Sequence, residues 1–227
     1  MRFDLLLQEH PVVTVLDPDL QASGAHCAHC FRRIASSNSF ELPADTDPLH
    51  SKFCSSDCLA ANKSQSHSLL FSTESPLPEE MVTAPVSPDA IEARQKAQAN
   101  FALYIEKEGR AVPLLVARFI ARQVAREINK MTSSGKTSDL KDEYTGADIE
   151  EYQLADHMER LRYLEVQSPA EGFRLLVDIL QTALPGLEQF VTEERHATLL
   201  GKMAYNAIGV CFGGGRDDKA GPIALMS

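Results

Sequence analysis

Four of the five cysteines in this 227-residue chain form two closely spaced pairs. Cys27 and Cys30 make a C-x2-C pair, and after a 23-residue spacer Cys54 and Cys58 make a C-x3-C pair. Zinc prefers four sulfur or nitrogen ligands at tetrahedral corners, and a short C-x2-C turn places two thiolates on one side of the ion. The second pair supplies the other side, so the sequence predicts one structural zinc ion held by these four residues. Four thiolates leave no open position for a catalytic zinc.

Other interpretations of the same residues explain less. Four ordinary buried thiols would not account for the paired spacing, and a thioredoxin-like pair needs a strand–helix setting that this segment lacks. Four histidines surround the cluster and could replace a cysteine as ligand: His26, His29, His50 and His67. Because four thiolates already satisfy the ion, we expect these imidazoles to support the ligands or to be exposed. Cys211 is expected to be a small core residue of the last helical segment.

The composition is typical of a folded globular protein, with 44% apolar and 24% charged residues. The formal net charge of −10 disfavours general binding to nucleic acids or anionic membranes. No apolar run in the sequence approaches the roughly 18–20 residues of a membrane span, and MRFDLLLQEHPVVTV is a poor signal peptide. We therefore expect reduced thiols and a location in the cytoplasm or nucleus.

The segments on either side of the cysteines differ in composition. Leucines and β-branched residues around Pro11 predict one or two short strands within residues 1–16. Serine, threonine and proline dominate from Ser64 to Asp89, which predicts an exposed linker.

Helix signals dominate after this linker. Ser87, Pro88 and Asp89 predict a helix start, and Gly109 predicts its end after about Glu108. A second helix is expected from Pro113, with a core-facing stripe at four-residue spacing. The stripe consists of Val116, Ile120, Val124 and Ile128, joined by Leu115 and Phe119. The arginines of the same helix, Arg118, Arg122 and Arg126, are expected on a solvated face paired with acidic groups.

Two more helices and a last helical region follow. One helix is expected from about Asp148, with apolar residues Ile149, Tyr152, Met158, Leu161 and Leu164. Ser168, with Pro169 and Glu171 after it, predicts a capping box for a helix through Leu184, and a helical region follows Pro185-Gly186. The predicted fold class is α+β and mostly α, with a short N-terminal β segment, a zinc-binding knuckle and a helical region.

The second cysteine pair resembles part of a known zinc finger. Phe53-Cys54-Ser55-Ser56-Asp57-Cys58 is similar to the aromatic-C-S-x-x-C element of MYND fingers, and Cys27-x2-Cys30 is similar to their opening pair. MYND fingers bind two zinc ions, and these four cysteines match the ligands of the first. At the family's distal H-x3-C this chain has His67 and Phe71, so the resemblance implies that the second zinc site is absent.

The context of the finger resembles the SET- and MYND-domain protein lysine methyltransferases, especially fungal members. Leu5-Leu-Leu-Gln-Glu-His-Pro-Val12 is similar to the strand that precedes the finger in that family, G-x-L-L-L-x-E-x-P-V. Tyr152-Gln-Leu-Ala-Asp-His157 resembles a Y-x-L-x-x-N stretch, and Lys202-Met-Ala-Tyr-Asn-Ala-Ile-Gly209 resembles a helix with an N-x-F element. His157 stands where the family has the Asn that helps to hold S-adenosylmethionine. The resemblance implies that His157 and Asn206 lie at the positions that bind this cofactor in an intact relative.

The chain also departs from the family. The G-x-G cofactor loop, the N-H-S-C motif and the later catalytic tyrosine have no counterpart in the printed sequence. We therefore expect a SET fold incomplete at both ends, which binds zinc but does not methylate lysine by itself. The alternative is a non-catalytic zinc-finger module for protein–protein interaction. Either hypothesis implies a protein substrate or peptide partner, with no membrane and no direct nucleic-acid binding.

The resemblance also divides the chain into segments. They are the N-terminal strands of a split SET domain (1–20), a MYND-like single-zinc finger (21–67), a linker (68–89), a helical SET-insert region (90–215) and a flexible tail (216–227).

Overall fold

The structure is a computed structural model, and it describes residues 12–35, 39–43, 46–82, 85–132 and 154–209. Within these residues it is mostly helical, with a single two-stranded antiparallel sheet. The first elements are α1 (Pro18–Ser23), β1 (Phe40–Glu41), β2 (Lys52–Phe53), α2 (Ser56–Asn62), the π-helical turn η1 (Lys63–His67) and α3 (Ser68–Leu70). The later ones are η2 (Glu79–Met81), α4 (Pro88–Glu108), α5 (Val112–Thr132), α6 (Leu154–Arg160), α7 (Ala170–Ala183), η4 (Leu187–Phe190) and α8 (Glu193–Asn206). The prediction of a mostly helical chain with a small β component is confirmed.

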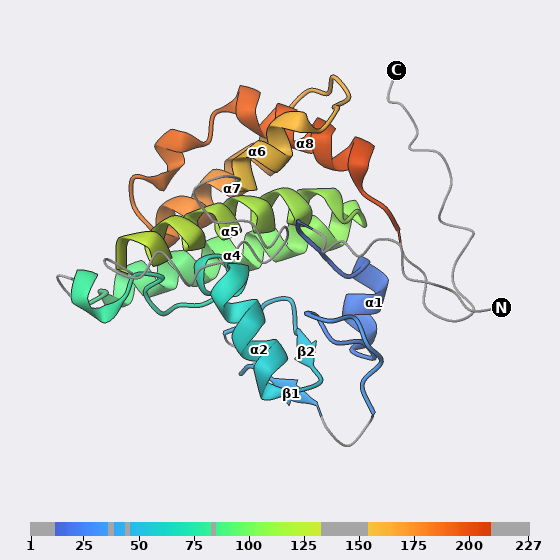
Figure 1. Cartoon of the computed structure of the whole chain (residues 1–227). Helices are drawn as coiled ribbons and strands as arrows, with labels where there is room; N and C mark the ends of the chain where they lie inside the picture. Colours follow the sequence, from blue (N-terminus) through green and yellow to red (C-terminus); the bar gives the residue numbers. More distant parts are fainter. Residues whose placement is uncertain (1–11, 36–38, 44–45, 83–84, 133–153, 210–227) are drawn as a thin grey trace.

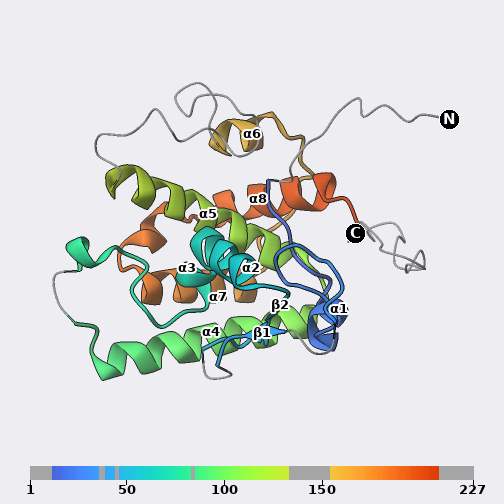
Figure 2. The same cartoon turned by 60° about the horizontal axis from the view of Figure 1, so that its bottom comes forward.

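The molecule has two parts. The cysteine-bearing segments, residues 16–62 with α1, β1, β2 and α2, lie together on one side of the long helices (Figure 1), and we call them the finger. The remaining helices form the helical body, in which α4 packs on α7 and α5 packs on α8. Figure 2 shows α3 among the body helices, and α3 contacts both α5 and α7. The helical run that begins in the finger therefore ends inside the body.

The start and end of α4 follow the sequence signals. Ser87 Oγ accepts a hydrogen bond of 3.2 Å from the Ala90 amide, and Pro88 occupies the first turn. Gly109 ends the helix in the left-handed region, with φ of 61°. That conformation strains residues with a Cβ, which is why glycine suits this position. The predicted bounds of this helix are confirmed.

The apolar stripe of α5 faces the core as predicted. Val116, Ile120 and Ile128 are buried, and Val124 packs against the same core half-buried. The arginines differ from the prediction of a solvated face, because Arg118 is only 6% exposed. Its Nη1 donates a hydrogen bond of 2.7 Å to the Thr14 carbonyl, which lies far away in the sequence.

The segment before the finger was predicted to contain strands, and this is wrong for the described part of it. Residues 12–16 form no strand, and α1 begins at Pro18. The carbonyl groups of this segment find side-chain partners on α5 instead of a neighbouring strand. Arg118 donates to Thr14, and Arg122 Nη1 donates to Val12 over 3.3 Å. Residues 1–11 lie outside the described residues.

The predicted linker from Ser64 to Asp89 is not exposed throughout. Its first residues continue the helical run of α2 through η1 into α3. Leu69, Leu70 and Phe71 are at most 3% exposed and belong to the core of the helical body. The finger and the body are therefore joined by a helix here, and the less regular part of the segment begins after Phe71.

The C-terminal helices differ from the prediction in two places. α6 ends at Arg160, so Leu161 and Leu164 are not helical, and the expected start near Asp148 lies outside the described residues. The capping box of α7 does not form, because Pro169 is its N-cap and no side chain caps it. Ser168 Oγ lies 2.7 Å from His196 Nδ1 instead, which links the start of α7 to α8.

Replacement of Ile120 by alanine tests the packing of α5. Ile120 is 4% exposed within the main core, so we expect Ile120→Ala to lower the free energy of unfolding by about 2–5 kcal/mol. Met131→Ala, at a 64% exposed position of the same helix, should change it by less than about 0.5 kcal/mol. Urea unfolding measures both values. An equally small loss for both variants would show that the stripe does not face the core.

Candidate metal centre

The first cysteine pair lies on a tight turn. The Phe31 amide donates to the Cys27 carbonyl and the Cys27 amide donates to the Arg32 carbonyl, each over 2.9 Å. His26 and Arg33 pair across the base of this turn as an antiparallel bridge. Phe31, directly after Cys30, has φ of 62°, a left-handed conformation that is uncommon for a bulky side chain. The turn reverses the chain within four residues, so that both sulfurs lie on the same side.

The second pair is placed by a strand and a helix start. β2 ends at Phe53, so that Cys54 follows the strand directly. Ser55 caps α2, and its Oγ accepts a hydrogen bond of 3.2 Å from the Cys58 amide. This cap fixes Cys58 in the first turn of α2. The Ala28 amide donates to the Lys52 carbonyl over 2.8 Å, which holds the first pair beside the second.

The four sulfur atoms converge on one point. All of them lie within 4.8 Å of one another, and no histidine or carboxylate joins the cluster among the described residues. The Cys30–Cys54 and Cys54–Cys58 Sγ distances are 3.5 and 3.6 Å. These distances are too long for a disulfide, whose sulfurs lie about 2 Å apart. A tetrahedron with zinc–sulfur bonds of about 2.3 Å has edges of about 3.8 Å, so the cluster is compatible with zinc.

The protonation of the four thiols is linked to metal binding, because a bound metal ion takes the place of their protons. Burial raises the pKa of the Cys30, Cys54 and Cys58 thiols. For Cys27, burial acts in the same direction, but the amide groups of Cys30, Cys54 and His29 outweigh it and lower the pKa to about 7. Cys27 is therefore partly deprotonated at neutral pH, whereas the other three thiols keep their protons there unless a metal ion replaces them.

The finger has little apolar core of its own. Its buried apolar residues are Leu16, Cys27, Ala28 and Phe53, packed against partly buried neighbours that include the other three cysteines. So few buried side chains do not offset the conformational entropy of the loops around them. A metal ion that cross-links four positions would supply the missing stabilisation.

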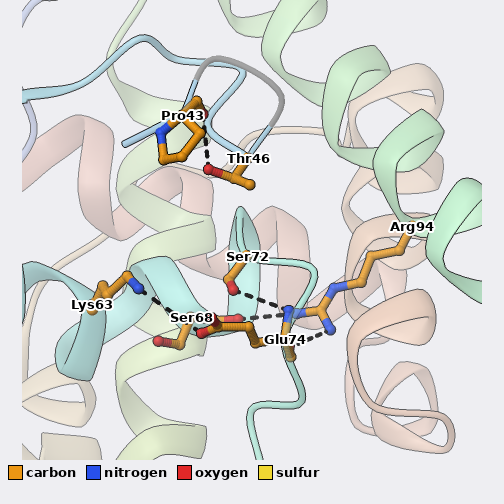
Figure 3. Close-up of polar contacts among 7 residues, drawn as sticks. All are labelled: Pro43, Thr46, Lys63, Ser68, Ser72, Glu74 and Arg94. Carbon is orange, nitrogen blue, oxygen red and sulfur yellow. Dashed lines mark hydrogen bonds and ion pairs between the residues drawn. The ribbon is translucent and has the colours of Figure 1, made fainter. Parts of the chain in front are cut away.

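Arg94 of α4 fixes the end of the helical run that leaves the finger (Figure 3). Its guanidinium is buried and donates to the Glu74 carbonyl over 2.8 Å and to the Ser68 carbonyl over 2.9 Å. Gln98, one turn later, donates to the Ser72 carbonyl over 3.0 Å. The last carbonyl groups of a helix have no partner within it, and a cation there is favourable. These bonds connect the far end of the helical run that begins at Cys58 to α4 of the body.

The four histidines near the cysteines are not ligands in this arrangement. His67 is 3% exposed inside the molecule, and burial, with a smaller effect of nearby Arg118, lowers its pKa to about 4 although Asp47 acts in the opposite direction. His26 lies on the bridge below the first pair, and His50 has φ of 49° in the loop before β2. For His67 the expectation of a supporting or exposed imidazole is wrong, because the side chain is buried and its ring lies 5.7 Å from that of Phe71 in the main core.

The two residues implied for S-adenosylmethionine do not share a described site. Asn206 is the last residue of α8, and its Nδ2 donates to the Arg162 and Lys202 carbonyls over 2.7 Å each. These bonds hold the segment after α6 against α8. His157 belongs to α6, but its side chain lies outside the described residues, as do Tyr152, Cys211 and the predicted tail.

Asp47 is a buried polar residue that the sequence did not single out. It is 1% exposed, and its carboxylate accepts the amides of Leu49 over 3.0 Å and Ser51 over 2.7 Å. In the preceding residues Thr46 Oγ1 donates to the Pro43 carbonyl over 2.8 Å (Figure 3). An aspartate before a proline is a turn signal, so Asp47-Pro48 could have indicated this ordered loop.

Comparisons with protein-family models, curated proteins and solved structures find no match for this chain. None of the described helices combines the length and apolarity that crossing a membrane requires. The residues and their geometry therefore carry the functional argument.

Metal analysis tests the cluster directly. Native mass spectrometry should show one zinc ion per chain, and chelation should unfold residues around 20–67, because binding energy at such a site is folding energy. Cys54→Ala should lose the metal, whereas Cys211→Ala removes the cysteine that belongs to neither closely spaced pair and should retain it. Two zinc ions, none, or full occupancy in Cys54→Ala would contradict this assignment.

Replacement of Arg94 tests the connection between finger and body. Arg94→Met leaves three carbonyl groups without their donor, and we expect a loss of about 2–4 kcal/mol in the free energy of unfolding. Lys96→Met, at an exposed position of the same helix, is the matched control and should change it by less than about 0.5 kcal/mol. Equal unfolding midpoints in urea would show that the Arg94 bonds contribute nothing.

Proposed function

We propose that this chain is a zinc-binding protein of the SET/MYND type in which the metal has a structural role. The observation that carries the proposal is the convergence of Cys27, Cys30, Cys54 and Cys58 from two separate chain segments. An all-thiolate set completes the tetrahedral coordination of zinc and leaves no position for substrate or reactive water. The ion would hold the turn, the hairpin and α2 together.

Two features support the resemblance behind this proposal. The four clustered cysteines are the ones that match the ligands of the first MYND zinc site. The order along the chain is also that of the family, with a short segment, the finger and then a helical region. Family membership and relation to lysine methyltransferases remain part of the proposal.

We propose protein or peptide binding, not methyl transfer, as the role of this chain. The specific observation is the engagement of Asn206, whose amide nitrogen is already used by two carbonyl groups of the protein. An amide held in this way fixes the segment after α6 and is not directed at a cofactor. A methyl donor has to be aligned with its acceptor to within about 1 Å for an efficient transfer.

Calorimetric titration with S-adenosylmethionine and with its demethylated product tests this choice. We expect no saturable heat for either compound with zinc-loaded protein, because Asn206 serves the fold. Asn206→Ala should lower the unfolding midpoint in the same preparation. Saturable binding that disappears in Asn206→Ala while zinc is retained would instead assign a cofactor role to this residue.

A further inference from the structure

A small polar cavity lies where the finger meets the helical body. Arg118 and Arg122 line it from successive turns of α5, and His29 lines it from the turn between the first two cysteines. Gln65 and Ser66 line it from the π-helical turn, and Thr14 lines it from the segment before the finger. Four separate parts of the chain thus contribute polar groups to one space. A π-helical turn is rare and often marks a functional position.

The described lining of this cavity is cationic. It contains two guanidinium groups and no carboxylate, although the whole chain has a net charge of −10. Burial lowers the pKa of Arg118 to about 10, which still leaves the side chain charged at neutral pH. Asp47 acts on Arg118 from nearby, but its two carboxylate oxygens accept the amides of Leu49 and Ser51.

Arg118 has more N–H groups than the described hydrogen bond uses. A guanidinium carries five N–H groups, and Arg118 uses Nη1 for Thr14 as its one hydrogen bond within the described part of the chain. Arg122 donates from Nη1 to Val12 over 3.3 Å, a contact that orients its head group toward the same segment. Two arginines on consecutive turns line one space, and a pair of guanidinium groups suits a flat oxyanion with two acceptor oxygens.

The size of the cavity restricts the ligand. Its volume is about 20 Å³, whereas one water needs about 10–15 Å³. One or two oxygen-sized groups fit, and a nucleoside or a whole cofactor does not. A carboxylate has two oxygens in a plane, and a tetrahedral phosphate is bulkier. The cavity opens to solvent, so the rest of a ligand would remain outside.

We propose that this cavity, the carboxylate slot, binds a single carboxylate between Arg118 and Arg122, with Gln65 and Ser66 as further donors. The slot deepens the proposed function, on which it rests, because His29 reaches it from the zinc-held turn. The carboxylate belongs either to a peptide partner or to a small free acid. In both cases the same four residues contact it.

Titration with sodium formate, followed by amide chemical shifts of the zinc-loaded full chain, tests the slot. We expect saturable shifts at His29 and Ser66 at constant ionic strength, with sodium chloride as the salt control. Arg122→Gln should weaken binding at least tenfold. Arg126→Gln is the matched control, because Arg126 lies one turn further along α5 and does not line the cavity. Linear shifts, equal shifts with chloride, or an unchanged titration in Arg122→Gln would overturn the proposal.

A second variant places the carboxylate inside the protein. Gln65→Glu keeps the side-chain shape and adds a negative charge beside the two arginines. We expect it to raise the melting temperature and to abolish the formate shifts, because the slot is then filled internally. A lower melting temperature together with retained formate shifts would overturn the proposal.

Two further measurements distinguish a peptide carboxylate from a small free acid, and a failure of the slot from a failure of the metal site. A short peptide with a free carboxyl end that binds tenfold more tightly than formate, and not after amidation, assigns the slot to a peptide partner; equal affinities assign it to a small acid. Zinc content is measured on the same samples. Zinc-loaded protein without saturable shifts overturns the slot and leaves the metal site, whereas zinc-free folded protein that binds formate overturns the metal site alone.

Discussion

Four thiols within 4.8 Å of one another cannot all lose their protons unless a cation lies among them. The fold of the finger depends on this constraint, because few other contacts hold its turn, hairpin and helix together. The backbone prepares for the ion by lowering the pKa of Cys27, while burial raises the pKa of the other three thiols. The ion would therefore replace the protons that these three thiols otherwise keep at neutral pH.

The helical run from α2 through η1 to α3 connects the cysteine cluster to the core of the helical body. Its first turn contains Cys58, and its end contributes Leu69 and Leu70 to the main core. Arg94 fixes that end by binding carbonyl groups that the helix itself cannot satisfy. A disturbance at the cysteines would thus reach the core along one continuous backbone, and the finger and body should not be treated as independent units.

The features that the sequence predicted correctly are those that depend on residues close together in the chain. Ser87 and Gly109 act on α4 through backbone groups a few residues away, and the spacing of the cysteines limits their geometry in the same local way. The predictions that were wrong depended on distant residues. Ser168 bonds to His196 instead of capping α7. Arg118 is buried, and it donates a hydrogen bond to the distant Thr14 carbonyl. No pattern within a single helix indicates such partners.

The buried polar groups at the junction explain why the two parts meet in one orientation. Apolar contacts alone tolerate small shifts, whereas Arg118 of the body donates to the Thr14 carbonyl, directly before the finger, only at a particular position. Asp47 of the finger also lies near enough to Arg118 to act on its charge. His67, 3% exposed between these charges and with its pKa lowered to about 4, stays neutral and adds no net charge. Arg118 and Asp47 are both buried and costly to bury alone, so a displaced finger would lose the attraction between their charges. The walls of the carboxylate slot come from these same segments, and its shape therefore depends on the Cys27–Cys30 turn, the π-helical turn and α5 remaining together.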